Sequence, residues 1–270
     1  MPSVLLTAAL KQEYERLFNT CSIRPDCATA ITTIISRIIA NAQRYHDVAD
    51  SLGIPWHFVA VIHCMEGGLD FTRHLHNGDP LTARTVRVPA GRPAAGAPPF
   101  TWEASARDAL SFKKLGPQVD WSLAGTLYQL ERYNGWGYRL YHPHVPSPYL
   151  WSFANHYQGG KYVADGRWSD TAVSKQCGAA VLLRRMAESG RIEFGDQPAP
   201  ATDAAPLVVD HSMKKSRNPA IVLRVEELQR WLNTFPGIFV KVDGIPGNRT
   251  SDAYRKVTGS YLPGDPRASG

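Results

Sequence analysis

Residues 55–71 read Pro-Trp-His-Phe-Val-Ala-Val-Ile-His-Cys-Met-Glu-Gly-Gly-Leu-Asp-Phe, an apolar segment that ends at an acid. Its apolar residues recur at helical spacing and are expected to pack inward: Phe58, Val61, Ile62 and Met65. Pro55 suits the first position of a helix, and Gly67-Gly68 suits its end. The segment therefore predicts a buried helix that carries Glu66 at its C-terminal end.

This position predicts a raised pKa for the Glu66 carboxyl. The backbone carbonyls at a helix C-terminus form the negative pole of the helix dipole. That pole and partial burial both disfavour the ionised form. Glycoside cleavage needs a carboxyl that is still protonated near neutrality, so Glu66 is a candidate general acid. The alternative is an ordinary surface glutamate at a helix end.

Composition and charge narrow the class of protein. The 270 residues suffice for one full core and a small second unit. No apolar run reaches transmembrane length, so we expect no membrane insertion. The net charge of +6 is spread along the chain, and the only dense basic cluster is Lys214-Lys215-Ser216-Arg217. Nucleic-acid binding would need a basic stripe or a reading motif, and the sequence has neither.

The first residues and the cysteines indicate whether the protein is exported. Residues 1–10 are mildly apolar but lack a basic start, so we expect no signal peptide. Cys21 and Cys27 flank a short loop that would close a disulfide if the protein were exported. Cys64 and Cys177 lie in apolar helical segments and are expected to be buried thiols.

Most of the chain follows helical patterns. Helices are expected over residues 4–18, 27–52, 55–66, 102–114, 121–132, 170–189, 221–234 and 248–257. Residues 72–92 instead contain strand-forming threonines and valines around Asn77-Gly78, a strong hairpin turn. Residues 197–206 are rich in proline and alanine, as in a linker. We predict an α+β domain over 1–195 that is mostly α-helical with a small β-hairpin, a linker over 196–217, and a small helical module over 218–270.

The order helix, acid, β-hairpin, helices resembles the lysozyme-like superfamily, which includes lytic transglycosylases, goose-type lysozymes, phage endolysins, chitinases and chitosanases. In that superfamily the general acid is a glutamate at a helix C-terminus beside a small β element, the place that Glu66 takes here. Tyr133-Asn134-Gly135 is similar to the Tyr-Asn-x-Gly type of motif in lytic transglycosylases, although Trp136-Gly137-Tyr138 departs from it. The segment 71–93 resembles lysozyme-like proteins of bacteria and their phages. The resemblance covers about residues 25–190 and implies cleavage of peptidoglycan glycan strands without a cofactor.

A second carboxylate decides between two mechanisms. Inverting glycosidases use one to activate water, at roughly 6.5–9.5 Å from the acid. Asp79 is the candidate base, and the alternative is that Asp79 serves only as a turn residue. Thr82 or Thr85 would orient the attacking water. A lytic transglycosylase needs only the acid, because the 6-hydroxyl of the sugar attacks the anomeric carbon. Asp70 is expected to cap local backbone, and Glu103 to be a first-turn helix acid.

Aromatic residues favour a sugar ligand as well. They crowd the region 133–168: Tyr133, Trp136, Tyr138, Tyr141, Tyr149, Trp151, Tyr157, Tyr162 and Trp168. Pyranose rings present apolar C–H faces that stack on such side chains. We expect a minority of these residues to contact ligand, with Tyr133 and Tyr149 first, and Asn134 and Trp151 as further candidates.

Histidines around Glu66 raise a metal-dependent alternative. They are His57, His63, His74 and His76, and His63 shares a helix face with Glu66. The sequence has no His-Glu-x-x-His motif and no zinc spacing of its cysteines, so we expect no metal site. The alternative hypothesis is a metal-dependent amidase in which these histidines are the metal ligands.

The C-terminal region resembles a helical peptidoglycan-binding module. Its pattern is a Leu-Gln helix at Leu228-Gln229, then Asp243-Gly244-Ile245-Pro246-Gly247, then Thr250 opening the next helix. Tyr254 departs from the small or aliphatic residue usual in that family. The core is expected to contain Leu228, Trp231, Leu232, Val242 and Ala253.

Taken together, the sequence predicts a peptidoglycan-degrading glycosidase, either a muramidase or a lytic transglycosylase. Without a signal peptide it would be an endolysin or a delivered antibacterial effector that acts at the cell wall or periplasm, as a monomer. The same features are compatible with a non-catalytic glycan-binding protein, and with a chitinase or chitosanase.

Overall fold

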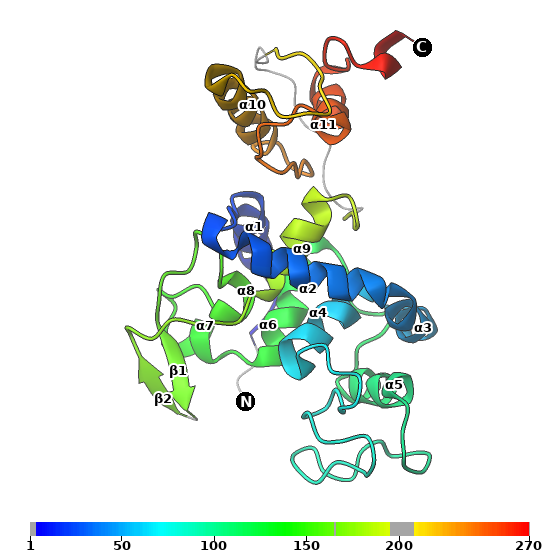
Figure 1. Ribbon diagram of the computed structural model, residues 1–270. Helices are drawn as coiled ribbons and strands as arrows, with labels where there is room; N and C mark the ends of the chain where they lie inside the picture. Colours follow the sequence, from blue (N-terminus) through cyan, green and yellow to red (C-terminus); the bar gives the residue numbers. More distant parts are fainter. Residues whose placement is uncertain (1–3, 165, 195–207, 270) are drawn as a thin grey trace. The chain divides into compact units, whose positions relative to one another are not determined.

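The computed structural model describes residues 4–164, 166–194 and 208–269. The chain divides into two compact units, one formed by residues 1–14 and 21–183 and the other by residues 15–20 and 184–270. Within the described residues the structure is mostly helical with one two-stranded antiparallel sheet (Figure 1), which confirms the α+β class.

The first unit is built from helices that differ in length and burial. They are α1 (Ala8–Asn19), α2 (Ala28–Ala40), α3 (Ala42–Leu52), α4 (Trp56–Gly67), α5 (Trp102–Phe112), α6 (Leu123–Asn134), α7 (Gly137–Tyr141), α8 (Pro148–Trp151) and α9 (Ala179–Glu188), with the 3₁₀ turn Pro25–Cys27 before α2. The last residues of α1 and α9 belong to the second unit.

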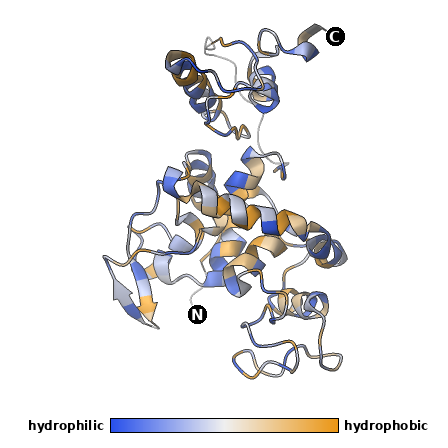
Figure 2. Cartoon of the chain, in the orientation of Figure 1, coloured by the Kyte–Doolittle hydropathy of each residue, from blue (hydrophilic) through white to orange (hydrophobic). Residues whose placement is uncertain are grey.

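Helix α4 forms the centre of this unit because it is apolar on all sides. Every residue from His57 to Met65 is buried, and Figure 2 shows hydrophobic residues gathered on α2 and α4. Helix α3 packs against α4 and α5, and α6 packs against α4 and α8. A helix that is hydrophobic all round is stable only when its neighbours cover every face. The predicted core positions Phe58, Val61, Ile62 and Met65 are confirmed.

Two helix predictions differ from the structure. The predicted helix over 27–52 is two helices, because Asn41 interrupts it with φ −113° and caps the first helix through its side chain, which donates to the Arg37 carbonyl. Asparagine competes in this way with continued helix formation. The helix predicted over 170–189 begins only at Ala179, and α7 and α8 lie in a region for which the sequence predicts loop.

The predicted β-hairpin over 72–92 is wrong. Among the described residues, this segment has only an isolated bridge between Arg73 and Pro80. Pro80, Pro89 and Pro93 lack the N–H groups that a ladder needs. The two strands lie elsewhere, as β1 (Lys161–Ala164) and β2 (Arg167–Ser169), at one side of the unit with α5 at the other (Figure 1).

The second unit holds the module predicted at the C-terminus. Helices α10 (Pro219–Leu232) and α11 (Asn248–Thr258) pack together, followed by the 3₁₀ turn Pro266–Ser269. Leu228, Leu232 and Ala253 are buried as predicted, and Trp231 packs at the edge of the core. Val242 is 38% exposed, contrary to the prediction, and Val240 is buried instead.

The predicted linker over 196–217 has two parts. Residues 196–207 lie outside the described residues. Residues 208–217 are attached to the module, since the His211 amide donates to the Pro263 carbonyl and the Ser212 amide to the Pro246 carbonyl. This segment is therefore part of the folded second unit.

All four cysteines are buried and none forms a disulfide. This confirms the buried thiols predicted for Cys64 and Cys177, and the structure has no disulfide between Cys21 and Cys27. No single helix in the part of the chain that the structure describes is long and apolar enough to cross a membrane. Helices α3 and α4 reach that length only as a pair, bent by 116°.

Candidate active site

Glu66 lies in the last turn of α4, immediately before a strained helix end. Gly68 has φ 59° and Leu69 has φ 62°, so two successive residues adopt the left-handed conformation. A left-handed Leu costs on the order of 1 kcal/mol, and such strain is enriched at functional sites. Leu69 is held there because its side chain is buried and its amide donates to the His63 carbonyl.

The last carbonyls of α4 have partners that fix the helix end. The Gly68 amide donates to the Cys64 carbonyl, and the Gln176 side-chain amide donates to the Met65 carbonyl at 2.8 Å. Gln176 comes from the loop before α9, far along the sequence from α4. This contact holds the backbone next to Glu66 in place.

Tyr149 on α8 is the direct partner of the acid. Its hydroxyl donates to Glu66 Oε1 at 2.8 Å. Burial first, and then the charge of Glu66, raise the pKa of Tyr149 well above its usual value, so the phenol remains a donor. The sequence singled out Tyr149 as a ligand contact, whereas its hydrogen bond to the acid was not predicted.

The surroundings of Glu66 raise the pKa of its carboxyl. The cause is displacement of water by neighbouring protein, opposed by the hydrogen bond from Tyr149 and by the charge of Lys113. The side chain is nevertheless solvent-exposed, so an external ligand can reach it. An accessible carboxyl with a raised pKa has the properties of a general acid near neutral pH.

Lys113 is a residue that the sequence did not single out. It follows α5 as its C-cap, and its ammonium lies 4.8 Å from the centre of the Tyr133 ring. Its charge favours the ionised form of Glu66. Lys113 was missed because its closeness to Glu66 depends on how α5 packs, although two lysines at a helix end were a visible signal.

The motif Tyr133-Asn134-Gly135 forms the end of α6. The Tyr133 hydroxyl donates to the Leu75 carbonyl at 3.4 Å, and burial followed by the charge of Glu66 raises the pKa of Tyr133. Asn134 is exposed, and Gly135 has φ 98°, which disfavours any residue with a side chain. Tyr133, Tyr149 and Glu66 therefore come together from three helices.

Asp79 has a structural role in its loop. Its Oδ2 accepts the amides of Val86 and Arg87 at 2.9 and 3.1 Å, and its Oδ1 accepts the Arg87 guanidinium at 2.5 Å. The hydrogen bond from the backbone amide of Arg87 is the largest of the causes that lower the pKa of Asp79 to about 2. A carboxylate that is 4% exposed and fully engaged is poorly suited to activate water, and none of its described polar contacts is with Glu66.

Three other predicted site residues are placed differently. Thr85 is buried, where its hydroxyl donates to the Pro89 carbonyl and accepts the Arg92 amide, so it closes the loop 85–92. Thr82 is exposed. Trp151 is 2% exposed and packs edge-on against His156, so it has no face to offer a sugar.

Asp70 and Glu103 have the local roles that were predicted. Asp70 accepts the Thr72 amide at 2.9 Å, and Glu103 lies in the first turn of α5, where it pairs with Arg44 at 2.6 Å.

The histidines near α4 make hydrogen bonds. His63 pairs with the Tyr45 hydroxyl at 3.1 Å, His74 with Ser105 and the Ala83 carbonyl, and His76 with Asp108 at 2.8 Å. Burial lowers the pKa of His57 and His63 to about 4. Within the described residues, no three His, Cys, Asp or Glu side chains are grouped to hold a metal ion.

Several of the predicted aromatics pack on one another. His142 stacks on Trp168 with ring centres 3.5 Å apart, and Tyr138 and Tyr162 pack edge-on around Trp168. These contacts cover the small sheet, so most of this region is a packed wall, as the sequence suggested for the majority.

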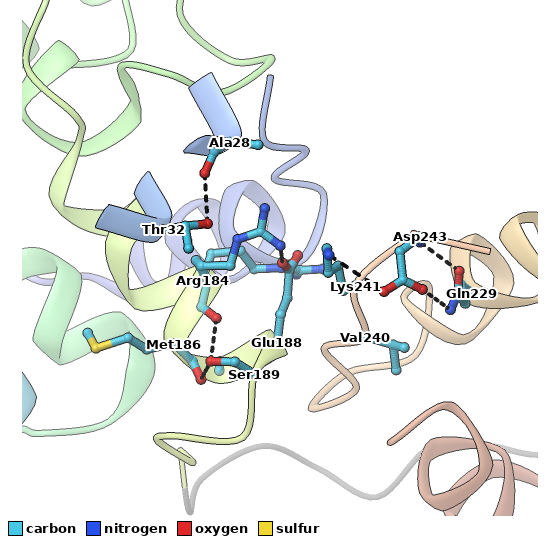
Figure 3. Close-up of polar contacts among 12 residues, drawn as sticks. Ala28, Thr32, Arg184, Met186, Glu188, Ser189, Gln229, Val240, Lys241 and Asp243 are labelled. Carbon is cyan, nitrogen blue, oxygen red and sulfur yellow. Dashed lines mark hydrogen bonds and ion pairs between the residues drawn. The ribbon is translucent and has the colours of Figure 1, made fainter. Parts of the chain in front are cut away.

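In the second unit, Gln229 organises the loop with the Asp-Gly pattern. Its amide nitrogen donates to Asp243 Oδ1, the Ile245 carbonyl and the Thr250 hydroxyl, and its oxygen accepts the amides of Asp243 and Gly244. Figure 3 shows the Gln229 side chain facing Asp243, which also pairs with Lys241. The buried side-chain amide of Gln229 thus joins the Leu-Gln helix to the Asp-Gly loop.

Comparison of the chain with family models, with curated proteins and with solved structures gives no match. The chemistry of the site therefore rests on its own geometry.

Proposed function

We propose that the first unit cleaves the glycan strand of peptidoglycan on a lysozyme-like fold, with Glu66 as its only general acid. The observation that carries this proposal is the exposed Glu66 carboxyl at the end of a buried helix, with a raised pKa and a hydrogen bond from Tyr149. The protonated carboxyl donates to the glycosidic oxygen, and positive charge develops at the anomeric carbon of the sugar.

Of the two mechanisms, the lytic transglycosylase is favoured. Asp79, the predicted base, already accepts three hydrogen bonds within its own loop and forms an ion pair with Arg87. With Asp79 engaged in this way, the 6-hydroxyl of the sugar is the nucleophile, and the ionised Glu66 takes its proton. Tyr149 stabilises that carboxylate after the first proton transfer.

The second unit is proposed to hold the enzyme on the wall. Support comes from the motif of the peptidoglycan-binding module, whose Leu-Gln helix and Asp-Gly loop are joined through Gln229. This assignment rests on likeness of motif, whereas that of the first unit rests on a site. The chain would act at the cell wall or periplasm after release or delivery.

Mass spectrometry of fragments released from purified peptidoglycan tests the activity, with Glu66→Gln as the comparison. We expect saccharides that end in a 1,6-anhydro sugar from the wild type and none from the variant, with unchanged circular dichroism. Reducing-end products would assign a hydrolase and return Asp79 to the mechanism. Equal release by both proteins would contradict the role of Glu66, and release by neither would favour a protein that only binds glycan.

A further inference from the structure

A cavity in the second unit is lined by most of the one dense basic cluster in the sequence. It has a volume of about 440 Å³ and lies between the segment 208–216, the first half of α10 and the loop with Gly244 and Pro246. Lys214, Lys215 and Arg224 all border it. This volume is within the range of small-ligand sites, roughly 300–1,000 Å³.

The cations at this cavity differ from three ion-paired cations in the same unit. Arg230 pairs with Glu226, Lys241 with Asp243, and Arg267 with Asp252 and Asp265. Among the described residues, the side chains of Lys214, Lys215 and Arg224 have no ion pair or hydrogen bond. Asp210 is the one carboxylate residue at the rim, so the lining has an excess of positive charge.

The side chain of one of these cations lies against the backbone of Gly244. An ideal Cβ on Gly244 would lie 3.3 Å from Lys215 Cε and 3.5 Å from its Nζ, so the lysine side chain passes over the bare glycine backbone. Gly244 has φ 72°, and its amide is fixed by Gln229. The segment that carries Lys214 and Lys215 is in turn bound through the Ser212 amide to Pro246.

Apolar groups share the lining with the cations. Val208, Ile221 and Pro246 border the cavity, and the Val208 and Ile221 side chains are 46% and 49% exposed. A long polyanion would need a charged stripe, whereas this lining is concave and mixed. Small apolar side chains next to a single anionic group fit such a lining best.

We propose that this cavity binds the C-terminal carboxylate of a short peptide with small apolar side chains. Lys215 and Arg224 hold the carboxylate, and the apolar rim takes the terminal side chain. The site is independent of glycan cleavage, because all of its residues lie in the second unit and the proposed acid lies in the first.

The test is an NMR titration of the ¹⁵N-labelled full chain with N-acetyl-alanyl-alanine, as the free acid and as its C-terminal amide. We expect the acid to shift the amides of Lys215 and Gly244, and the amide form to bind at least about tenfold more weakly, since charge-assisted hydrogen bonds are lost. Lys215→Gln and Arg224→Gln should each weaken binding of the acid about fivefold or more.

Arg217→Gln is the matched control, because Arg217 belongs to the same basic cluster but does not line the cavity. It should leave binding of the acid unchanged. Equal binding of acid and amide would overturn the proposal, as would an equal loss on Arg217→Gln. Tighter binding of a polyphosphate that depends equally on Arg217 would assign a general polyanion surface and also overturn it.

Discussion

The Tyr149 hydroxyl donates a 2.8 Å hydrogen bond to Glu66 Oε1, across 83 residues of sequence. The bond favours the ionised carboxyl and so opposes the effect of burial on the pKa of Glu66. Its removal therefore moves the pKa of the acid upward.

Tyr149→Phe is expected to shift the alkaline limb of the pH–rate profile to higher pH, because Glu66 stays protonated further into the alkaline range. The rate at the optimum should fall on the order of tenfold, since the carboxyl loses a positioning contact. Turnover of purified peptidoglycan measured between pH 4 and 9 checks both effects. A limb that does not move, or that moves to lower pH, would contradict the role given to the hydroxyl.

Lys113→Met tests the second influence on the acid. The ammonium lowers the pKa of Glu66, so its loss should also move the alkaline limb to higher pH while the hydrogen bond from Tyr149 is kept. The neighbouring Lys114→Met removes an equal charge from the exposed residue next to it and should leave the limb in place. Equal shifts for the two variants would indicate a general charge effect and not a specific neighbour.

Local signals explain what the sequence predicted well. The helix that carries Glu66 depends on Pro55, on an apolar run and on Gly67-Gly68, all within a few residues of one another. Tyr149 was singled out by the aromatic pattern as a ligand contact, and its hydrogen bond to Glu66 was not predicted. Gln176, which holds the Met65 carbonyl, gave no signal, because a lone polar residue reveals no contact with a segment 111 residues away.

The failed hairpin shows the converse. Asn77-Gly78 does form a turn, with φ 76° at Gly78, but a turn specifies strands only if both flanks can pair. Here the prolines lack the N–H donors of a β-ladder. The side chains of Asp79 and Thr85 also accept backbone amides that strand pairing would have used. The sheet formed instead by β1 and β2 is short and irregular, which leaves little pattern to detect.

Asp79→Asn separates a structural role from a catalytic one. We expect a lower melting temperature, because the ion pair with Arg87 is lost, and unchanged cleavage products. The pKa of Asp79 is lowered to about 2, below an unfolded value of about 3.9. Its stabilising effect is therefore complete above that value and is lost as the pH falls through 2.

Thermal unfolding of wild type and Asp79→Asn between pH 6 and 2 measures this contribution. The difference in melting temperature should shrink toward the acid end. Asp50→Asn, at an exposed position of α3, serves as a control for the loss of a carboxylate. Abolished cleavage by a stably folded Asp79→Asn would contradict the structural role and support the water-activating one.

Gln229 is the buried residue on which the second unit depends most. It is 1% exposed, and its amide satisfies polar groups of Asp243, Gly244, Ile245 and Thr250. Gln229→Leu keeps the apolar volume but leaves buried donors and acceptors without partners. A buried polar group left unsatisfied costs about 1–3 kcal/mol, so we expect a loss of at least that size in the unfolding free energy of this unit.

Urea denaturation followed by hydrogen exchange of amides in α10 and α11 measures the loss for this unit alone. Glu227→Leu, on the exposed side of the same helix, should change the free energy of unfolding by less than about 0.5 kcal/mol. Because Gln229 also fixes the Gly244 amide, the same substitution should release Lys215 and abolish binding of the peptide acid. An intact module with intact peptide binding in Gln229→Leu would show that the loop is held by other contacts.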